Sequence, residues 1–140
     1  MNMENEKCVI IIDESLPLGV IANTAAILGV TLGMKLPGIV GPDVTDRGGR
    51  VHMGIIRFPV PVLKATREHL YSLRAKLFSA EYAGLTVVDF SSLAQNCRTY
   101  DEFISKLSAC PEEELSYAGI AVCGSKKKVN RLTGNMPLLR

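Results

Sequence analysis

The sequence contains no tryptophan and only two histidines, and aromatic residues make up 6% of it. Its cysteines never occur in the CxxC spacing that is typical of a zinc site. The chain also has neither a glycine-rich phosphate loop of the GxGxxG or GxxxxGKS/T type nor the GxSxG turn of serine hydrolases. These absences predict that the protein uses no cofactor and no metal bound by a standard motif.

Length and charge limit the class of protein further. The chain has 140 residues, 47% of them hydrophobic and 21% charged, which is the composition of a globular protein. We expect a single domain over residues 1–140, with residues 1–6 as a loose tail. Sixteen basic and 14 acidic residues leave a net charge of +2. That charge is too small to indicate a nucleic-acid-binding protein by itself.

The cysteines and the amino terminus bear on location. Cys8 and Cys123 lie in apolar runs, where a thiol behaves as a small hydrophobic side chain. The polar, acidic start of the chain lacks the pattern of a secretory signal, so we expect a reducing cytoplasm. Residues 15–34 carry no charge and approach the length of a membrane span. Because Pro17, Asn23 and Thr31 dilute their apolarity, we predict a buried core helix and no membrane association.

The stretch over residues 7–33 organises the rest of the chain. Residues 8–12 (C-V-I-I-I) form a short, mostly β-branched run, which is typical of a strand buried on both faces. A turn over residues 13–17 leads into an apolar helix of small residues, which should end near Gly33. Apolar residues go nearly all the way round this helix. We therefore expect the domain or a partner to cover it on more than one side.

The remaining pattern alternates strands with helices. We predict a hairpin tip at residues 46–49 with positive φ angles at Gly48 and Gly49, a strand over 50–58, a helix over 62–80, a strand over 85–90, a helix starting at the capping box of Thr99, a strand over 116–122, and a short helix from Ser125 to about Leu132. This order predicts the α/β class. Specifically, we expect a three-layer α/β/α sandwich with a mixed or mainly parallel sheet of about four strands plus a hairpin.

Two stretches are candidates for binding or catalysis. Asp13 follows a buried strand and precedes a helix, where a carboxylate is well placed for chemistry. The common alternative is that Asp13 or Ser15 caps the helix. Gly124, Ser125 and Lys126 begin a run of three lysines at the start of a short helix, where an anion would relieve charge repulsion. The alternative here is a solvated lysine run on the surface.

A metal site is the weaker possibility. His52 is near Asp43 and Asp46 in the sequence, and these residue types can bind metals. However, aspartates in turns are explained by hydrogen bonds to their own backbone. We therefore predict that the protein holds no metal there.

Three segments of the chain resemble the second-type, archaeal and eukaryotic, peptidyl-tRNA hydrolases. Residues 130–139 (N-R-L-T-G-N-M-P-L-L) are similar to the closing D-K-V-T-G-H-L-K-L segment of that family. In the opening D-L-x-M-G-K-G-K-I-A-A-Q-C-S-H-A segment, Asp13, Gly19, Ile21 and Ala22 fall on matching positions without a gap. Residues 83–87 (A-G-L-T-V) resemble the family's helix-to-strand junction. The resemblance covers most of the chain in element order and implies the peptidyl-tRNA hydrolase II-like fold.

The positions that carry the family's chemistry differ. Its two lysines around the glycine fall on Leu18 and Val20, and its glutamine falls on Thr24. The acidic residue of its later D-A-G-R-T-Q motif is absent unless Asp89 substitutes from three positions earlier. Residues 95–114 look like an insertion, and residues 42–49 have no clear counterpart. The resemblance therefore implies a divergent branch, a domain of unknown function that has lost the standard site.

Three hypotheses of function follow. The first is a domain that binds a small ligand or a protein partner. The second is a hydrolase acting on peptidyl-tRNA or a related ester, with catalysis moved to Asp13, Asp89 or the lysines at 126–128. The third is a structural subunit whose first helix is buried by a partner. We expect a homodimer, and a small anionic ligand or RNA as the ligand class. The predicted ligand-binding residues are Asp13, Ser15, Gly19, Asn23, Gly124, Ser125 and Lys126.

Overall fold

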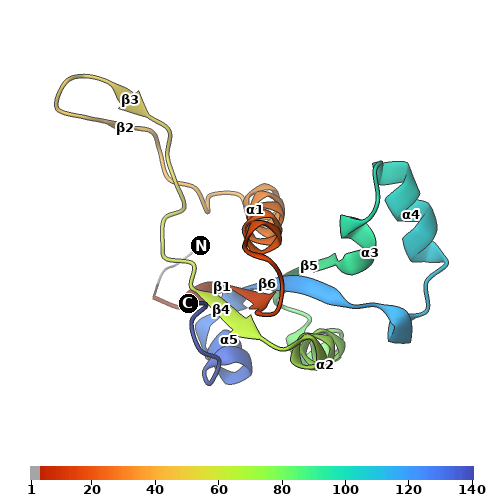
Figure 1. Ribbon diagram of the computed structural model, residues 1–140. Coiled ribbons are helices and arrows are strands. Elements are labelled where there is room, and N and C mark those ends of the chain that lie inside the picture. The colour runs from red at the N-terminus through yellow and green to blue at the C-terminus, as the bar shows by residue number, and fades with distance from the viewer. Residues whose placement is uncertain (1–3) are drawn as a thin grey trace.

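The computed structural model describes residues 4–140 (Figure 1). In this range the α-helices are α1 (Leu18–Lys35), α2 (Arg67–Leu77), α3 (Ser92–Gln95), α4 (Tyr100–Ser108) and α5 (Lys126–Thr133). The strands are β1 (Glu6–Asp13), β2 (Val44–Thr45), β3 (Val51–His52), β4 (Val62–Ala65), β5 (Thr86–Ser91) and β6 (Tyr117–Ser125). Two short 3₁₀ helices, η1 (Ala80–Tyr82) and η2 (Glu112–Glu114), lie between them.

The main sheet of the described residues has four strands in the order β4-β1-β6-β5. β1 runs parallel to β4 and antiparallel to β6, and β5 is also antiparallel to β6. β2 and β3 pair with each other in a separate hairpin. The predicted α/β sandwich, with a mixed sheet of about four strands plus a hairpin, is confirmed.

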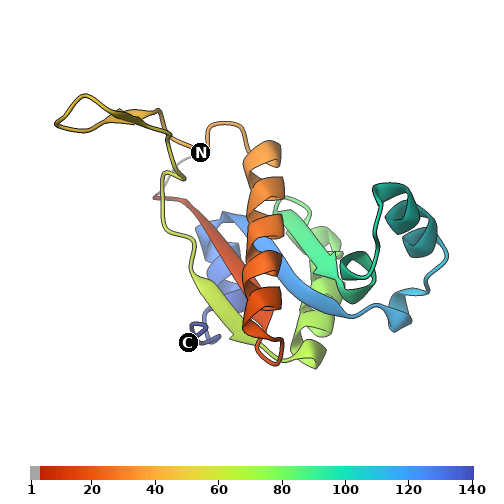
Figure 2. The same ribbon diagram turned by 45° about the horizontal axis from the view of Figure 1, so that its top comes forward.

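Helices cover both faces of this sheet. α1 lies on one face, and α2 and α5 lie on the other (Figure 1), while Figure 2 shows α1 running across the strands. The side chains of β1 alternate between the two cores: Val9 and Ile11 pack with α2 and α5, whereas Ile10 and Ile12 pack under α1. All four are buried. The β-branched run therefore forms a strand buried on both faces, as predicted.

A narrow stripe of side chains holds α1 on the sheet. Thr24, Leu28 and Leu32 are its buried residues. Gly119 of β6 makes room for them, because a Cβ atom there would lie 2.8 Å from Cγ2 of Thr24 and 3.1 Å from Cδ1 of Leu28. The rest of α1 is partly or fully exposed. The expected cover on more than one side is therefore not provided by residues 4–140.

The segment between α1 and α2 differs most from the prediction. Residues 50–58 were expected to form a strand of the sheet, but only Val51–His52 is a strand, and it belongs to the hairpin. The sheet strand is instead β4, at residues that the sequence pattern gave to a helix. Thr66 separates the two elements, because its hydroxyl accepts a hydrogen bond from the His69 amide at 3.1 Å and caps α2.

The hairpin tip lies at the predicted residues, with one difference. Gly49 has a φ of 90°, but Gly48 does not take a positive φ. Asp46 fastens the tip instead: its Oδ1 accepts hydrogen bonds from the Gly48 and Arg50 amides at 2.9 and 3.0 Å. Its Oδ2 lies 2.8 Å from Nε2 of His52. The hydrogen bond with His52 is the largest cause of the lowered pKa of Asp46.

Two predicted helix starts have different outcomes. The capping box is confirmed, because Oγ1 of Thr99 accepts a hydrogen bond from the Glu102 amide at 3.1 Å. Ser125 precedes α5, but its side chain makes no capping hydrogen bond within residues 4–140. The Lys126 amide donates instead to the carbonyl of Asn5 at 2.8 Å. This bond holds Asn5 beside the sheet, and β1 begins at Glu6, so the prediction of a loose tail is wrong for these two residues. Residues 1–3 of the predicted tail lie outside the described residues.

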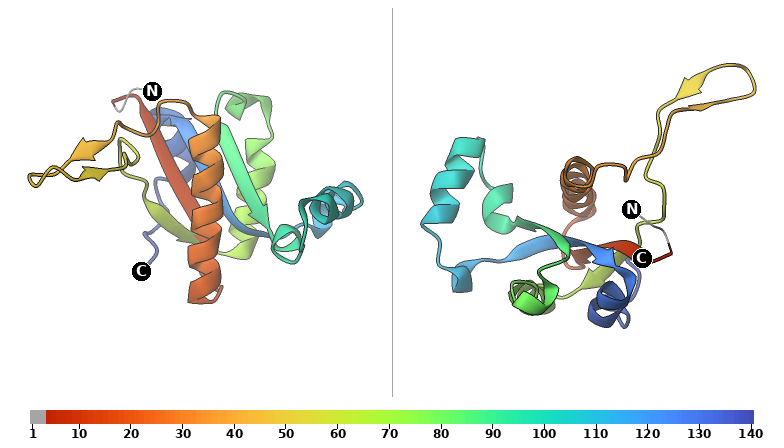
Figure 3. Two further views of the ribbon diagram at one scale, coloured as in Figure 1. Left: turned by 90° about the horizontal axis from the view of Figure 1, so that it is seen from above. Right: turned by 180° about the vertical axis from the view of Figure 1, so that it is seen from behind.

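Two segments project beyond the three-layer body. The β2–β3 hairpin extends from one side, and α3 and α4 extend from the other (Figure 3). α4 is amphipathic in sequence, yet it has no buried residue in the described chain. The predicted insertion at residues 95–114 therefore forms most of one projection, and the loop at residues 42–49 forms most of the other.

Cys8 and Cys123 are directly opposite each other on β1 and β6 and form a disulfide. The interpretation of these two cysteines as free, small hydrophobic side chains is wrong for this structure. They are 115 residues apart in the sequence, so only the strand register brings them together. Disulfides persist mainly in oxidising compartments. The cytoplasmic location therefore stays a prediction.

The disulfide predicts the number of reactive thiols. When the protein is unfolded without reductant and titrated with a thiol reagent, we expect two reactive groups per chain, from the free Cys97 and Cys110. Prior reduction should raise the number to four. Four thiols before reduction would contradict the disulfide and return Cys8 and Cys123 to the role of small core side chains.

The close approach of α1 to β6 predicts the effect of a methyl group at Gly119. We expect Gly119→Ala to lower the free energy of unfolding by about 1–3 kcal/mol, because the added Cβ overpacks the contact with Thr24 and Leu28. Gly84→Ala is the matched control, since a Cβ atom there meets nothing within 4 Å. It should change stability by less than about 0.5 kcal/mol. Equal effects in urea unfolding would contradict the packing account.

Candidate functional site

Three strands of the sheet end together and lead into helices. β1 ends at Asp13, which is opposite Ala65 at the end of β4, and β5 ends at Ser91, opposite Tyr117 at the start of β6. α1, α2 and α3 begin within a few residues of these strand ends. The carboxyl ends of strands beside helix amino termini are the usual position of ligand sites in α/β proteins. We call this region the strand-end site.

Asp13 is the central polar group of the strand-end site. It is only 1% exposed. Its Oδ1 accepts hydrogen bonds from the amide and the hydroxyl of Ser15, at 2.9 and 2.7 Å. Its Oδ2 is buried without a hydrogen-bond partner among residues 4–140, and the nearest opposite charge is Nε of Arg67 at 3.5 Å. Buried carboxylate oxygens are nearly always hydrogen-bonded, so Oδ2, which has only the Arg67 charge beside it, is a buried acceptor that still lacks a donor.

A pocket of about 320 Å³ opens beside Asp13. Its described lining comes from the turn after β1 and from the first turn of α2: Asp13, Glu14, Ser15, Thr66, Arg67 and Glu68. Three of these side chains are carboxylates and one is a guanidinium. The lining is therefore polar, with an excess of negative charge.

Two further buried oxygens near this end of the sheet lack a hydrogen-bond partner in the described chain. They are Oγ1 of Thr24 and Oγ of Ser116. Thr24 packs over Gly119, which is paired with Ile12, and Ser116 directly precedes β6. All the buried side-chain oxygens left unpaired in residues 4–140 therefore lie toward the strand-end site. Unpaired polar groups are costly in a core, and they concentrate where a ligand or water completes them.

The expected cap of α1 by Asp13 or Ser15 is wrong. The N-cap position is Pro17, which has no side-chain group to accept an amide hydrogen bond. Asp13 instead closes the turn before the helix through Ser15. This leaves the carboxylate buried at the end of β1 and fixed in orientation by two donors.

The predicted ligand-binding residues do not form one site. Glu6 is paired with Ser125 and Lys7 with Gly124, because β6 runs antiparallel to β1. Gly124, Ser125 and Lys126 therefore lie at the amino end of β1, a full strand length from Asp13. The carboxyl ends of β1 and β6 therefore lie at opposite ends of the sheet, and the two groups of residues cannot line one pocket.

The lysine run at the start of α5 makes contacts with its own chain. The Lys126 amide donates to Asn5, as described above, and Nζ of Lys128 donates to the carbonyl of Glu81 at 2.9 Å. Nη1 of Arg131 lies 3.2 Å from a carboxylate oxygen of Glu81. These contacts agree with a surface lysine run that fastens α5 to η1. Anion binding there stays a prediction.

Of the positions on α1 that match the resemblance, Gly19 and Ala22 are exposed, whereas Ile21 packs against the core under α1. Gly19 and Asn23 are exposed, as is Leu18, which stands at the position of the first family lysine. Only Thr24, among the family's polar positions, faces the sheet. The outer surface of α1 near the strand-end site is therefore uncharged.

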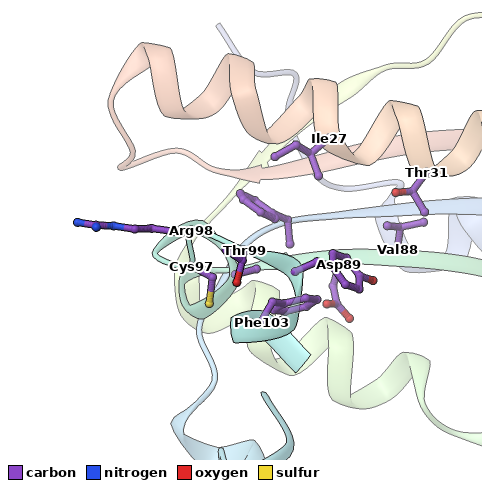
Figure 4. Close-up of a pocket in the computed structure, with 11 residues that line it drawn as sticks. Ile27, Thr31, Val88, Asp89, Cys97, Arg98, Thr99 and Phe103 are labelled. Carbon is purple, nitrogen blue, oxygen red and sulfur yellow. The ribbon is translucent and has the colours of Figure 1, made fainter. Parts of the chain in front are cut away.

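A second pocket, of about 450 Å³, lies between α1, β5 and the α3–α4 projection (Figure 4). Ile27, Val88 and Phe103 give it apolar walls. Arg98 extends away from the cavity in Figure 4. Asp89 borders the cavity, but its Oδ2 accepts a hydrogen bond from Nε of Arg74 at 2.7 Å. The polar chemistry of this pocket is thus largely committed to contacts within the chain.

The two candidate catalytic aspartates do not act as a pair. Asp89 is on β5, and Asp13 is on β1, with β6 between them. Two strand spacings separate them by roughly 10 Å. Asp89 is also held by Arg74, whose guanidinium stacks 3.7 Å from the ring centre of Phe78. Because Arg74 already holds Asp89 and no described pocket is lined by both aspartates, Asp13 is the stronger candidate.

The third candidate, a metal site, has no cluster of ligands in the part of the chain that the structure describes. Within residues 4–140, no three histidine, cysteine, aspartate or glutamate side chains come together to hold a metal. His52 and Asp46 are paired, but they lie exposed in the hairpin tip, where Asp46 already accepts two backbone hydrogen bonds. Asp43 is also occupied, since its Oδ1 accepts the Gly54 amide at 3.0 Å. These turn aspartates thus have the backbone partners that the sequence suggested.

Sequence reasoning missed four residues that line the pocket of the strand-end site: Glu14, Thr66, Arg67 and Glu68. Arg67 lies beside Asp13, and Thr66 and Glu68 line the same pocket, only because β4 is parallel to β1 and ends beside it. Thr66 could have indicated the start of α2, because threonine is a favoured N-cap residue and its side chain accepts the amide of His69. It was overlooked because the helix was placed over residues 62–80, which put Thr66 inside it.

Comparisons with known proteins agree with this fold. A solved structure of a protein of unknown function from Agrobacterium tumefaciens strain C58 is similar, with a TM-score of 0.85 and 17% sequence identity. The match covers 96% of this chain and 97% of that one. No curated protein matches the sequence.

At this identity the solved structure shows the fold alone. The sequence itself gives the family, because residues 6–140 match the family described as "Protein of unknown function (DUF2000)". That match spans nearly the whole chain. The chain therefore belongs to the DUF2000 family of proteins of unknown function.

Proposed function

We propose that the protein is a small-molecule-binding domain of the peptidyl-tRNA hydrolase II-like fold, with its ligand at the strand-end site. The observation that carries this proposal is Oδ2 of Asp13, which is buried at the edge of a polar pocket and accepts no hydrogen bond from the described residues. The opening strand–turn–helix unit and the residues 130–139 motif support the fold assignment. The uncharged start of α1 argues against the family's reaction, because Leu18 and Val20 stand where lysines would meet a polyanion.

The charge of the pocket selects the ligand chemistry. Asp13, Glu14 and Glu68 outnumber Arg67 in the lining. Anions and RNA phosphates would be repelled by this excess of carboxylates, whereas a cationic hydrogen-bond donor would be attracted. An ammonium group can donate to Oδ2 of Asp13 while Oδ1 keeps its bonds to Ser15. We therefore propose a small compound with a primary amine, in place of the anionic ligand or RNA expected from the sequence.

Arg67 gives the pocket a second anchor. Its guanidinium is 3.5 Å from Asp13, and about half of its side chain is exposed. It can remain beside Asp13 or turn toward an acceptor group on the ligand. A compound that carries an amine and a nearby acceptor, such as a carboxylate or carbonyl, would engage both residues.

A hydrolase is the alternative function. The same oxygen of Asp13, which accepts no hydrogen bond from the described residues, favours it, since a fixed carboxylate can act as a general base toward water. A peptidyl-tRNA hydrolase must also hold the tRNA phosphates, and the described lining of the pocket supplies Arg67 as its one cation. The lysines at 126–128 cannot help, because they lie at the other end of the sheet.

The proposal predicts selective binding of an amine probe. We expect propylammonium to shift the NMR amide resonances of Asp13, Ser15 and Arg67 with millimolar affinity, which is usual for a fragment of this size. Asp13→Asn should weaken binding at least about tenfold, because the ligand loses its charged acceptor. Asp89→Asn is the matched control and should leave the affinity unchanged, since Asp89 lies outside the pocket.

Propionate is similar in size to propylammonium and opposite in charge, so it tests whether the pocket binds cations or anions. Shifts produced by propionate or phosphate at these residues, and none by propylammonium, would contradict the proposed ligand class. The hydrolase is tested separately by incubating the protein with N-acetyl-aminoacyl-tRNA. Cleavage that is lost in Asp13→Asn but kept in Asp89→Asn would show that the site is catalytic.

A further inference from the structure

The outer face of α1 has the composition of an interface. Residues 18–34 contain no charged side chain. Leu18, Val30 and Met34 are 82%, 74% and 81% exposed, and between them the surface is made of small residues such as Ala22 and Ala26. The exposed side of a helix in a monomeric protein is normally polar and charged. This face is therefore suited to contact with another apolar surface.

The β2–β3 hairpin presents a second apolar surface. Val44, Val51, Met53 and Ile55 are between 62% and 87% exposed. β2 and β3 have two residues each. Among the described residues they pair with each other and not with the main sheet. An isolated two-stranded hairpin is marginally stable in water and gains order by packing on a further surface. The body of its own chain does not offer one, because the hairpin extends away from it (Figure 3).

The two surfaces are adjacent. The stem of the hairpin, where Val40 bridges Ile56, adjoins Gly29 and Gly33 of α1 in one apolar pocket. From there the hairpin rises on the α1 side of the sheet (Figure 1). We call the exposed apolar side chains of α1 and of the hairpin, which this pocket connects at the hairpin stem, the α1–hairpin surface.

We propose that this surface binds a second copy of the chain, with the α1 faces in contact and each hairpin packed on the partner. The residues that carry it are the exposed apolar side chains of α1 and the hairpin: Leu18, Val30, Met34, Val40, Val44, Val51, Met53 and Ile55. At roughly 100 Å² of exposed surface each, these eight supply about 800 Å² per chain. A stable interface of standard size buries about 800 Å² on each partner.

Self-association accounts for features that another occupant does not. In a two-fold symmetric dimer the same patch serves both chains, so one uncharged, self-complementary surface is sufficient. Small residues along α1 allow two helices to approach closely. The hairpin then finds on the partner the packing that its own domain lacks. This inference does not depend on the ligand proposed for the strand-end site.

A membrane is the other occupant to consider. By length and composition α1 is long and apolar enough to cross one. However, Thr24, Leu28 and Leu32 anchor α1 in the core of the domain. Helices that lie on membranes also carry lysines and arginines on their polar face, and α1 has Lys35 alone, at its last position. The observations therefore favour a protein surface.

The test is the solution mass of the full chain. By light scattering or sedimentation we expect twice the 15.2 kDa of one chain. Val30→Glu on α1 and Met53→Glu on the hairpin should each halve the measured mass, because each buries a charge in the apolar interface. Leu138→Glu is the matched control: Leu138 is also an exposed apolar residue, but it pairs with the outer edge of β4. This variant should remain a dimer.

Circular dichroism establishes whether each variant is folded. If Val30→Glu does not fold, Met53→Glu alone tests the interface, because Met53 lies outside both cores. A wild-type mass of one chain at the highest concentration reached would overturn the proposal. So would a dimer that persists in a folded Met53→Glu or Val30→Glu variant. A monomer that floats with phosphatidylcholine vesicles, and is released by Val30→Glu, would assign the surface to a membrane instead.

Discussion

The antiparallel pairing of β1 with β6 is the constraint on which the rest of the structure depends. Seven residue pairs, from Glu6 opposite Ser125 to Ile12 opposite Gly119, place these two strands at the centre of the sheet. The pairing joins residues 6–12 to residues 119–125, sets Cys8 against Cys123 and positions Gly119 under α1. It also places Asp13 and Lys126 at opposite ends of the sheet, which separates the predicted ligand-binding residues into two groups.

This division decides which chemistry the fold permits. Asp13 lies beside Ser15 and Arg67 and lines, with them, a small pocket with an excess of negative charge. Lys126 and its neighbours pack against residues of η1 and the amino-terminal strand. A site that held an anion between the strand end and the lysines would need β1 and β6 to be parallel. The proposed amine ligand follows from the strand directions as much as from the side chains.

Sequence reasoning succeeded where one local pattern determined one element. The β-branched run of β1, the glycine turn at Gly49 and the capping box of Thr99 each needed only near neighbours. It failed at β4, a four-residue edge strand that contains Lys64, because its identity depends on pairing with β1. The position of Arg67 beside Asp13 and the disulfide also depend on strand pairing, so the sequence did not predict them. Strand direction and register are long-range properties, and no local periodicity records them.

The proposed amine ligand requires a hydrogen-bond donor on Oδ2 of Asp13. The most direct measurement is a high-resolution crystal structure of the protein soaked with propylammonium, alongside an unsoaked crystal. The account predicts an ammonium nitrogen within hydrogen-bonding distance of Oδ2, with Oδ1 still bound by Ser15. An ordered water on Oδ2 in both crystals, with the amine elsewhere or absent, would contradict it.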